Sequence, residues 1–229
     1  ELVTNGSFAT DTDWDKLSGA TISSGQANLV FNGLGNPAVK QNIPIIQGKT
    51  YKIVFNVSRW VSGKLEVYVS GDTRSGFVVL NGVGQYEVIL KINTVADIRF
   101  VGNGVASDFS IDNVSVKEVG QDWTLESSWS IGDNVVIASG ASSNISQIIL
   151  TSGVSYKLTY EVVTSDNNNL LGYLGGNVAI SIPSTVGTHT VYGVSDGAYF
   201  VIRNQGFNGS ITNISVKEVG QNWTLGTGW

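Results

Sequence analysis

The stretch DFSIDNVSVKEVGQDW, residues 108–123, decides the fold of this chain because the chain contains it twice. Residues 208–223 read NGSITNISVKEVGQNW, so the two copies are related by a constant offset of 100 positions. Further upstream, residues 39–57 match residues 145–163, and each of these copies carries a Gly at a turn and a Tyr shortly after it. A repeat of this length has the size of a domain rather than of a solenoid repeat.

The closing strand of each copy does not follow simple alternation. Side chains of a regular strand point to opposite faces in turn, so Ile111, Val114 and Val116 cannot all face inward. A β-bulge at Asp112 and Asn113 would restore the pattern. The second copy has the same apolar spacing, so we predict the same bulge there.

The repeat defines the expected domain organisation. We predict a first module over residues 1–119 and a second over residues 120–219, with the boundary near Gly120. Residues 220–229 read GQNWTLGTGW and match the start of the second module, so they are expected to begin a third, truncated repeat. On this interpretation the natural protein continues into further modules.

Alternation indicates strands throughout. The segment YKIVFNVSRW (residues 51–60) places Tyr51, Ile53, Phe55 and Val57 on one face. Turn signals recur at roughly the 8–12-residue spacing of a β-sandwich, and no run of a dozen residues has helical apolar spacing. We therefore predict an all-β protein of two tandem β-sandwich modules, each with roughly eight strands in two sheets, as in a jelly roll.

Composition excludes several classes of partner. The chain contains no Cys, which excludes disulfides and thiolate chemistry. Its formal net charge is −5, and neither module has a basic face able to neutralise phosphates. No apolar run approaches the length of a membrane span. Nucleic acid and membrane are therefore not expected as partners.

Two motifs carry a family resemblance. The opening LVTNGSFATDTDWD (residues 2–15) resembles the first strand and loop of jelly-roll carbohydrate-binding modules that are appended to xylanases and laminarinases. The closing DFSIDNVSVKEV (residues 108–119) resembles their last strand. Together with GQDWTL and WSIGDN, the pattern is similar to tandem modules of phage tail fibres and other virion proteins. The resemblance implies a location on a virion or on the outside of a cell.

The resemblance also raises the question of a structural metal site. In many such modules an acidic residue after the Phe of the opening motif, together with an Asp of the closing strand, holds a structural calcium ion. Here Ala9 follows Phe8, whereas Asp112 stands at the closing position of module 1 and Thr212 at that of module 2. Asp112 is therefore the metal candidate, for Ca²⁺ in module 1, and no other cofactor is expected. The three acids of DTDWD (residues 11–15) offer hard oxygen ligands, or simply form a solvated loop.

The outward face of one sheet is the candidate carbohydrate-binding site. Aromatic rings there would stack on sugar rings, while carboxylate, amide and guanidinium groups would pair with hydroxyls. In module 1 the residues expected on this face are Asn56, Trp60, Glu66, Tyr68 and Arg99. In module 2 the sequence match places Tyr173 at the position of Tyr68 and Tyr199 at that of Arg99. The alternative is that a loop or a neighbouring unit covers the aromatic residues.

Enzyme chemistry has little support. His189 is the only His and is expected on a strand facing solvent, and no third group can be assigned to orient it. A glycosidase needs two carboxylates that flank one bond, and Glu66 has no evident partner. Trp14 and Trp129 are expected to be equivalent core residues, and Trp123 is expected to pack within or between units.

Three functions therefore remain from the sequence. The first is a non-catalytic surface-recognition protein of a virion or cell surface, whose partners are glycans or a host-surface polysaccharide. The second is a structural spacer whose outward aromatics contact neighbouring modules or subunits of the same assembly. A remote third is a glycoside hydrolase or an accessory domain of one.

Overall fold

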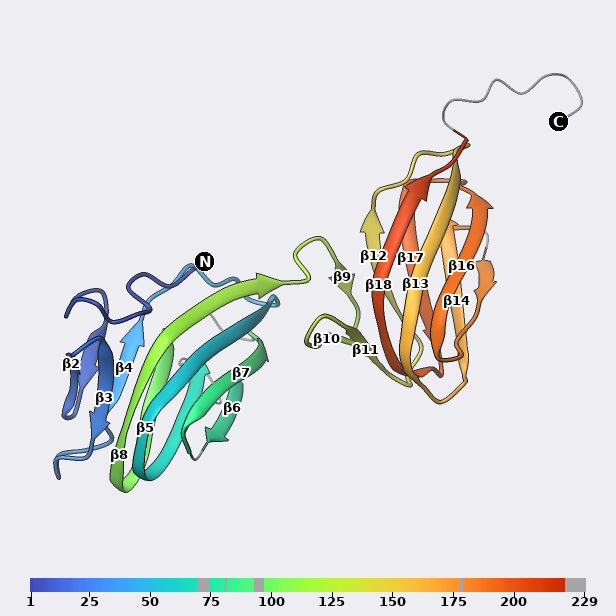
Figure 1. Cartoon of the computed structure of the whole chain (residues 1–229). Coiled ribbons are helices and arrows are strands. Elements are labelled where there is room, and N and C mark those ends of the chain that lie inside the picture. The colour runs from blue at the N-terminus through green and yellow to red at the C-terminus, as the bar shows by residue number, and fades with distance from the viewer. Residues whose placement is uncertain (70–74, 81, 93–96, 178, 221–229) are drawn as a thin grey trace, which may run out of the picture. The chain divides into compact units, whose positions relative to one another are not determined.

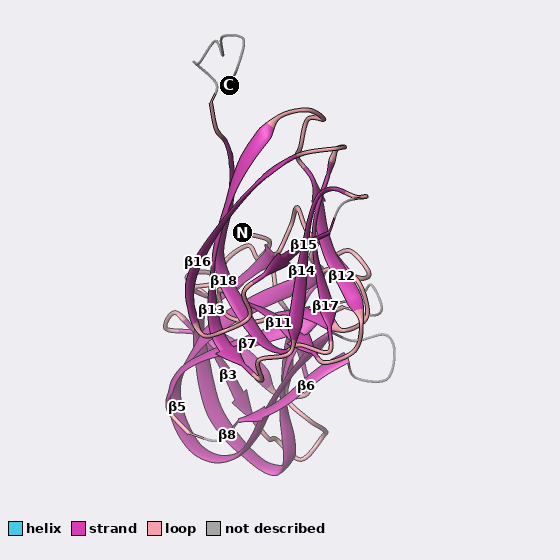
Figure 2. Ribbon diagram, turned by 90° about the vertical axis from the view of Figure 1, so that its right-hand side faces the viewer, coloured by secondary structure: helices cyan, strands magenta, loops and turns pink. Residues whose placement is uncertain are grey.

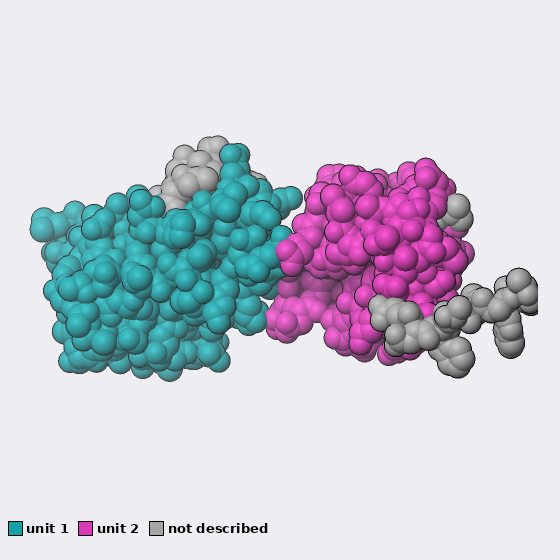
Figure 3. Space-filling model, turned by 90° about the horizontal axis from the view of Figure 1, so that it is seen from above, with its two compact units in different colours: residues 1–121 teal, residues 122–229 magenta. Residues whose placement is uncertain are grey.

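The chain folds into two compact units, residues 1–121 and residues 122–229 (Figure 3). The computed structural model describes residues 1–69, 75–80, 82–92, 97–177 and 179–220. Strands and loops make up this part of the chain (Figure 2), and it contains no helix long and apolar enough to cross a membrane. The predicted third repeat covers residues 220–229, of which only Gly220 belongs to the described residues.

Unit 1 is built from antiparallel strands. Among its described residues the strands are β1 (Asp15–Leu17), β2 (Ala20–Ser23), β3 (Gln26–Val30), β4 (Ala38–Gln41), β5 (Thr50–Val69), β6 (Ser75–Leu80), β7 (Gly84–Lys91) and β8 (Ile98–Val119).

Two long strands connect the layers of unit 1 (Figure 1). The first half of β5, residues 50–57, pairs with β7 and with the second half of β8. The second half of β5, residues 65–69, pairs with β6 and with the first half of β8. Both strands bend between these halves, and at Gly63 (φ 100°) an added Cβ would collide with the backbone of Ser107. Glycine thus allows the two bends to lie against each other.

The bends produce two sheets that share β5 and β8. Sheet I has the order β2, β3, second half of β8, first half of β5, β7. Sheet II has the order β1, β4, first half of β8, second half of β5, β6. This arrangement confirms the predicted all-β jelly-roll sandwich.

Unit 2 repeats the topology with shorter strands. Its described strands are β9 (Thr124–Leu125), β10 (Trp129–Ile131), β11 (Val136–Ser139), β12 (Ser143–Ile148), β13 (Ser155–Ser165), β14 (Asn169–Gly175), β15 (Ala179–Ile182), β16 (Gly187–Val194), β17 (Tyr199–Gln205) and β18 (Asn208–Glu218). Sheet I has the order β10, β11, β18, β13, β16, and sheet II has the order β9, β12, β17, β14, β15. Separate strands β13 and β14 therefore take the place of β5, and β17 and β18 take the place of β8.

The predicted bulge is confirmed in both units. Between the pair Val54–Ser115 and the pair Asn56–Asp112, β8 contains one residue more than β5. Asn113 takes up this residue in the left-handed region (φ 53°), and Asn213 does the same in unit 2 (φ 52°). Asn is one of the few residues other than Gly that adopt this conformation at low cost. The bulge brings three apolar side chains to the inner face, namely Ile111, Val114 and Val116.

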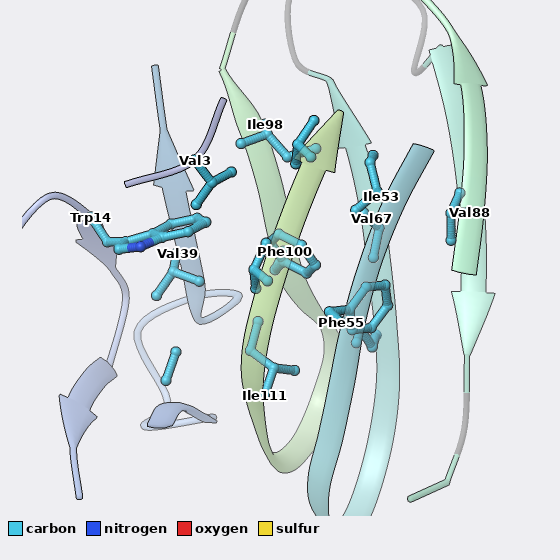
Figure 4. Packing of buried hydrophobic residues seen from close by; sticks show 14 of the residues in the cluster. Val3, Trp14, Val39, Ile53, Phe55, Val67, Val88, Ile98, Phe100 and Ile111 are labelled. Carbon is cyan, nitrogen blue, oxygen red and sulfur yellow. The ribbon is translucent and has the colours of Figure 1, made fainter. Parts of the chain in front are cut away.

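The core of unit 1 lies between its two sheets. Phe55 of sheet I and Phe100 of sheet II meet edge to face, with their ring centroids 5.1 Å apart. Trp14 packs on the other side of Phe100 at 6.1 Å, and these side chains point toward one another in Figure 4. Unit 2 has a separate core, which includes Tyr160 and Phe200. Each unit therefore buries its own apolar interior.

The tryptophans are buried as expected, but one equivalence was wrong. Trp14 and Trp129 are only 5% and 3% exposed. Trp14 directly precedes β1, whereas Trp129 begins β10 and pairs with Ala138. Trp123 directly precedes β9, which pairs with β12 as β1 pairs with β4. The structural counterpart of Trp14 is therefore Trp123, which packs on Phe200 with ring centroids 6.0 Å apart.

His189 does not face solvent as predicted. It lies half-buried on the inner side of β16, with its ring centroid 5.4 Å from that of Tyr160. Its Nε2 lies 2.6 Å from the carbonyl oxygen of Thr185. Burial raises the pKa of the Tyr160 hydroxyl, which donates to the carbonyl of Pro183. The imidazole thus packs beside Tyr160 on the inner face of the sheet.

Candidate functional site

The outer face of sheet II gathers three of the predicted site residues in unit 1. Tyr68 on β5 pairs with Arg99 on β8, which pairs with Lys40 on β4, which in turn pairs with Asp15 on β1. Directly paired residues point to the same face of a sheet, so these four side chains form a row across it. We refer to this row and its neighbours as the sheet II face of unit 1.

An ion-pair network holds the charged part of this row in place. Lys40 Nζ lies 3.1 Å from Asp97 Oδ2 and 3.4 Å from Asp15 Oδ2, and Arg99 Nη2 lies 3.1 Å from Asp97 Oδ2. Burial alone would raise the pKa of Asp97, but hydrogen bonds from Lys40 and Arg99 outweigh this effect and lower that pKa. Asp97 thus holds both cationic side chains in place. The buried Nε of Arg99 has no hydrogen-bond partner in the described structure.

Replacement of Asp97 by Asn should lower the stability of unit 1 relative to wild type, and this loss should be larger at neutral pH than in acid. A carboxyl whose pKa is lowered by folding contributes stability above its unfolded pKa of about 4, and this contribution is lost as the pH falls through the folded value. Because the network is at the surface, we expect a difference of about 1 kcal/mol or less at pH 7. Urea unfolding at pH 7 and at pH 3 measures it, and a difference that does not shrink in acid contradicts the assignment.

Glu66 lies on the same face, one row away, but it is only 4% exposed. Its Oε1 accepts a hydrogen bond from Asn103 Nδ2. Its neighbours across the sheet, Val101 and Ala38, are also buried. Glu66 therefore serves to support the face rather than to offer an open carboxylate.

Asn56 and Trp60 are not on this face, so the prediction that all five residues share one surface was wrong. Asn56 lies on the half of β5 that belongs to sheet I, where it pairs with Gln85 and Asp112. Trp60 lies at the bend and stacks on Phe109, with ring centroids 4.8 Å apart and planes only 8° apart. The bend separates both residues from Tyr68, and the register of β5 against β8 shifts three times between Val57 and Lys64. Simple alternation of side chains therefore does not carry from Asn56 to Tyr68.

The sheet II face of unit 2 has a different character. Tyr173 pairs with Val201, as Tyr68 pairs with Arg99, so Val201 and not Tyr199 is the counterpart of Arg99. Tyr199 lies one row further along, between Gly175 and Ile148. Tyr199 is 50% exposed and Ile148 is 69% exposed. Uncharged side chains thus replace the charged row of unit 1, with Ser146 and Thr124 at the positions of Lys40 and Asp15.

The acidic residues of unit 1 do not converge on a metal site in the described part of the chain, which contains no cluster of three acidic or His side chains suited to an ion. Asp112 accepts hydrogen bonds from the backbone and side-chain nitrogens of Asn113, at 2.6 and 3.1 Å. Asp11 pairs with Lys16, and Asp15 pairs with Lys40. Calcium at Asp112 stays a prediction.

Sequence reasoning missed three residues of this region. Lys40 and Asp97 complete the charged row, and Gln41 anchors the beginning of the chain. The signal for Gln41 was available, since VKQ at residues 39–41 matches ISQ at residues 145–147, whereas Lys40 is matched by Ser146 and gave no such signal. Asp97 gave no signal, because only the fold brings it beside Lys40.

Comparisons with known proteins give structural likenesses only. No protein-family model matches the chain, and a search of curated proteins finds no match. The chain is similar to the N-terminal tandem CBM22-1–CBM22-2 domains of Paenibacillus barcinonensis Xyn10C, with 10% identity and a TM-score of 0.36 over 98% of this chain and 91% of that one. It is also similar to the triple jelly-roll turret protein of an archaeal virus, with 13% identity and a TM-score of 0.25 over 90% of this chain and 59% of that one.

Proposed function

We propose that this protein is a non-catalytic recognition protein whose sheet II faces bind glycans on a host or cell surface. The observation that carries the proposal is the repeated position of Tyr68 and Tyr173, each half-exposed at the same point of the second sheet. A Tyr ring offers an apolar surface to the C–H face of a sugar and keeps a polar hydroxyl group.

The groups beside Tyr68 suit a hydroxyl-rich ligand. Arg99 and Lys40 supply fixed donors, and two carboxylates supply acceptors, that of Asp15 within the row and that of Asp97 beside it. Because the network holds these side chains before a ligand arrives, binding requires little further ordering. Net charge within the row is balanced, which favours neutral saccharides over polyanions.

The two faces should prefer different ligands. Unit 1 offers charged groups beside its Tyr, whereas unit 2 offers Val201, Tyr199 and Ile148. Contacts of this kind are individually weak, and a tandem arrangement strengthens them through effective concentration when both units engage one surface. This is consistent with a location on a virion or outside a cell, which we include in the proposal.

No bond is broken in this function. Glu66, the acid that the sequence offered for a hydrolase, is almost fully buried and hydrogen-bonded to Asn103. The other two acids of the face, Asp15 and Asp97, form ion pairs with Lys40. A glycosidase acid or nucleophile must reach the bond between two sugars.

A glycan array probed with the full chain tests the proposal, followed by calorimetry on the sugars that bind. For a sugar held by unit 1, Tyr68→Ala should weaken binding at least tenfold, which corresponds to about 1.4 kcal/mol. Tyr173→Ala is the matched control and should leave that sugar unaffected, while weakening any sugar held by unit 2. Absence of any retained glycan, or retained glycans that neither Tyr68→Ala nor Tyr173→Ala weakens, would contradict the proposal.

A second candidate, a spacer or assembly module, is favoured by one observation. Ile148, Ile149 and Tyr199 are 69%, 48% and 50% exposed, and large apolar surface of this kind often contacts another protein. Sedimentation distinguishes the two functions. A monomer at all concentrations supports glycan recognition, whereas an oligomer that an Ile148→Lys substitution dissociates supports assembly.

A further inference from the structure

The first residues of unit 1 form an added edge beside β8. We call residues 1–8 the N-terminal segment. The N–H of Val114 donates to the carbonyl of Gly6 at 2.8 Å, and the N–H of Leu2 donates to the carbonyl of Val116 at 3.0 Å. The N–H of Val116 donates to the Glu1 carboxylate at 2.7 Å. The segment thereby satisfies the backbone of β8 just beyond its bulge.

Gln41 clamps this segment from inside the sandwich. Thr4 N–H donates to Gln41 Oε1 at 3.0 Å, and Gln41 Nε2 donates to the carbonyls of Thr4 and Asp13 at 2.9 and 2.8 Å. Phe8 is buried and packs on Trp14, with ring centroids 5.1 Å apart. Val3 is buried as well, so backbone, amide and apolar contacts all hold the segment.

Unit 2 has the equivalent strand edge, but no segment like residues 1–8 covers it. Ile214 and Val216 follow the bulge of β18 as Val114 and Val116 follow that of β8. In unit 1 the N–H groups of Val114 and Val116 point to the side of β8 that the N-terminal segment covers. On the corresponding side of β18, no strand of the described residues pairs beyond Ile211. The side chains of Ile214 and Val216 are only half-buried, whereas Val114 and Val116 are 5% and 1% exposed.

Unit 2 also has a Gln at the position of the clamping residue Gln41. Gln41 pairs with Ile98 one position after the Lys40–Arg99 pair, and Gln147 pairs with Phe200 one position after the Ser146–Val201 pair. Taking Tyr68 and Tyr173 as equivalents, Gln147 is therefore the counterpart of Gln41. Gln147 is half-buried and makes no side-chain hydrogen bond in the part of unit 2 that the structure describes.

The chain has no residues to cover this edge from the preceding side. Unit 1 has fourteen residues before β1, but only Gly120, Gln121, Asp122 and Trp123 lie between β8 and β9. Trp123 takes the place of Trp14 without a counterpart of Phe8, and it is correspondingly half-buried. Ser215, the counterpart of the Ser115 that donates to Glu1, is retained.

We propose that unit 2 binds an extended segment of another polypeptide by strand addition along residues 214–216 of β18. The segment that fits has the chemistry of residues 1–8, namely an acid, a branched apolar residue, an Asn-Gly turn and a Phe. The backbone of this segment forms hydrogen bonds with the backbone of Ile214 and Val216. One of its inward-facing peptide groups forms hydrogen bonds with the side chain of Gln147, and its Phe packs beside Trp123. Strand addition of this kind takes affinity from main-chain hydrogen bonds and specificity from side-chain pockets. The site is distinct from the sheet II face, so it joins proteins while that face remains free.

The test uses the full chain and a synthetic peptide with the sequence ELVTNGSF. Because unit 1 holds its own segment, added peptide reports on unit 2. We expect saturable binding by calorimetry in the micromolar-to-millimolar range and slower hydrogen exchange at Ile214 and Val216, with no change at Val114 and Val116. A Gln147→Ala substitution should weaken binding at least fivefold, with Gln147→Glu as the second variant if the first does not fold. Thr190→Ala on the exposed side of β16 is the control.

A second peptide, with Ala in place of Gly6, sharpens the result. In unit 1 a Cβ at Gly6 would collide with the carbonyl oxygen of Val114, so this peptide should not bind. Equal binding of both peptides, unchanged exchange at residues 214–216, or no binding at millimolar peptide would overturn the proposal. So would slow exchange at these residues that deletion of residues 221–229 accelerates, because the chain itself would then cover the edge.

Discussion

Replacing Phe100 by Ala is expected to lower the free energy of unfolding of unit 1 by about 3–5 kcal/mol. The ring is fully buried, and it contacts both Phe55 and Trp14, which come from different parts of the chain. Truncation therefore removes the transfer energy of the ring and leaves a cavity between the two sheets. A small domain has only about 5–15 kcal/mol of stability, so the loss is a large fraction of the total.

Calorimetry of the full chain measures this effect. Because each unit has a separate core, we expect two unfolding transitions, of which Phe100→Ala lowers only the one from unit 1, by more than about 10 °C. Leu34→Ala is the matched control, since Leu34 is 84% exposed and its loss should cost less than about 0.5 kcal/mol. A common shift of both transitions would show that the units do not unfold independently.

Much of the fold could be predicted because it depends on local pattern and repetition. The apolar residues of 51–57 alternate on a single straight half-strand, and their burial follows directly. The bulge could be predicted from Ile111, Val114 and Val116, since three inward residues at that spacing permit few alternatives. The repeat then extended both conclusions to unit 2.

The site could be predicted only in part because β5 crosses from one sheet to the other. Glu66 and Tyr68 were placed correctly relative to Arg99, since all three belong to sheet II. Asn56 belongs to sheet I, and Trp60 lies at the bend, although the sequence between them shows no interruption. The direction of a side chain after a bend depends on Gly63 and the facing bend of β8, and these are long-range contacts.

The largest backbone effect is expected from Gly6→Ala, which should release the N-terminal segment from unit 1. Gly6 does not have a positive φ, so the cost is steric: the new methyl group would meet the carbonyl oxygen of Val114, which belongs to the backbone and cannot turn away. Release exposes Val3 and Phe8 and breaks the hydrogen bonds of Gln41. The conformational entropy that the released segment regains offsets part of this cost. We expect a loss of about 2–4 kcal/mol, confined to unit 1.

Gly48→Ala separates this steric effect from backbone strain. Gly48 has φ 85° and open space around its Cα, so Ala there should cost only about 1–2 kcal/mol from its left-handed conformation. Hydrogen exchange gives the decisive readout, because Gly6→Ala should accelerate exchange at Val114 and Val116 to the rates of Ile214 and Val216, whereas Gly48→Ala should not. If Val114 and Val116 keep their protection in the Gly6→Ala variant, the segment is not held through Gly6, and the comparison between the edges of the two units loses its basis.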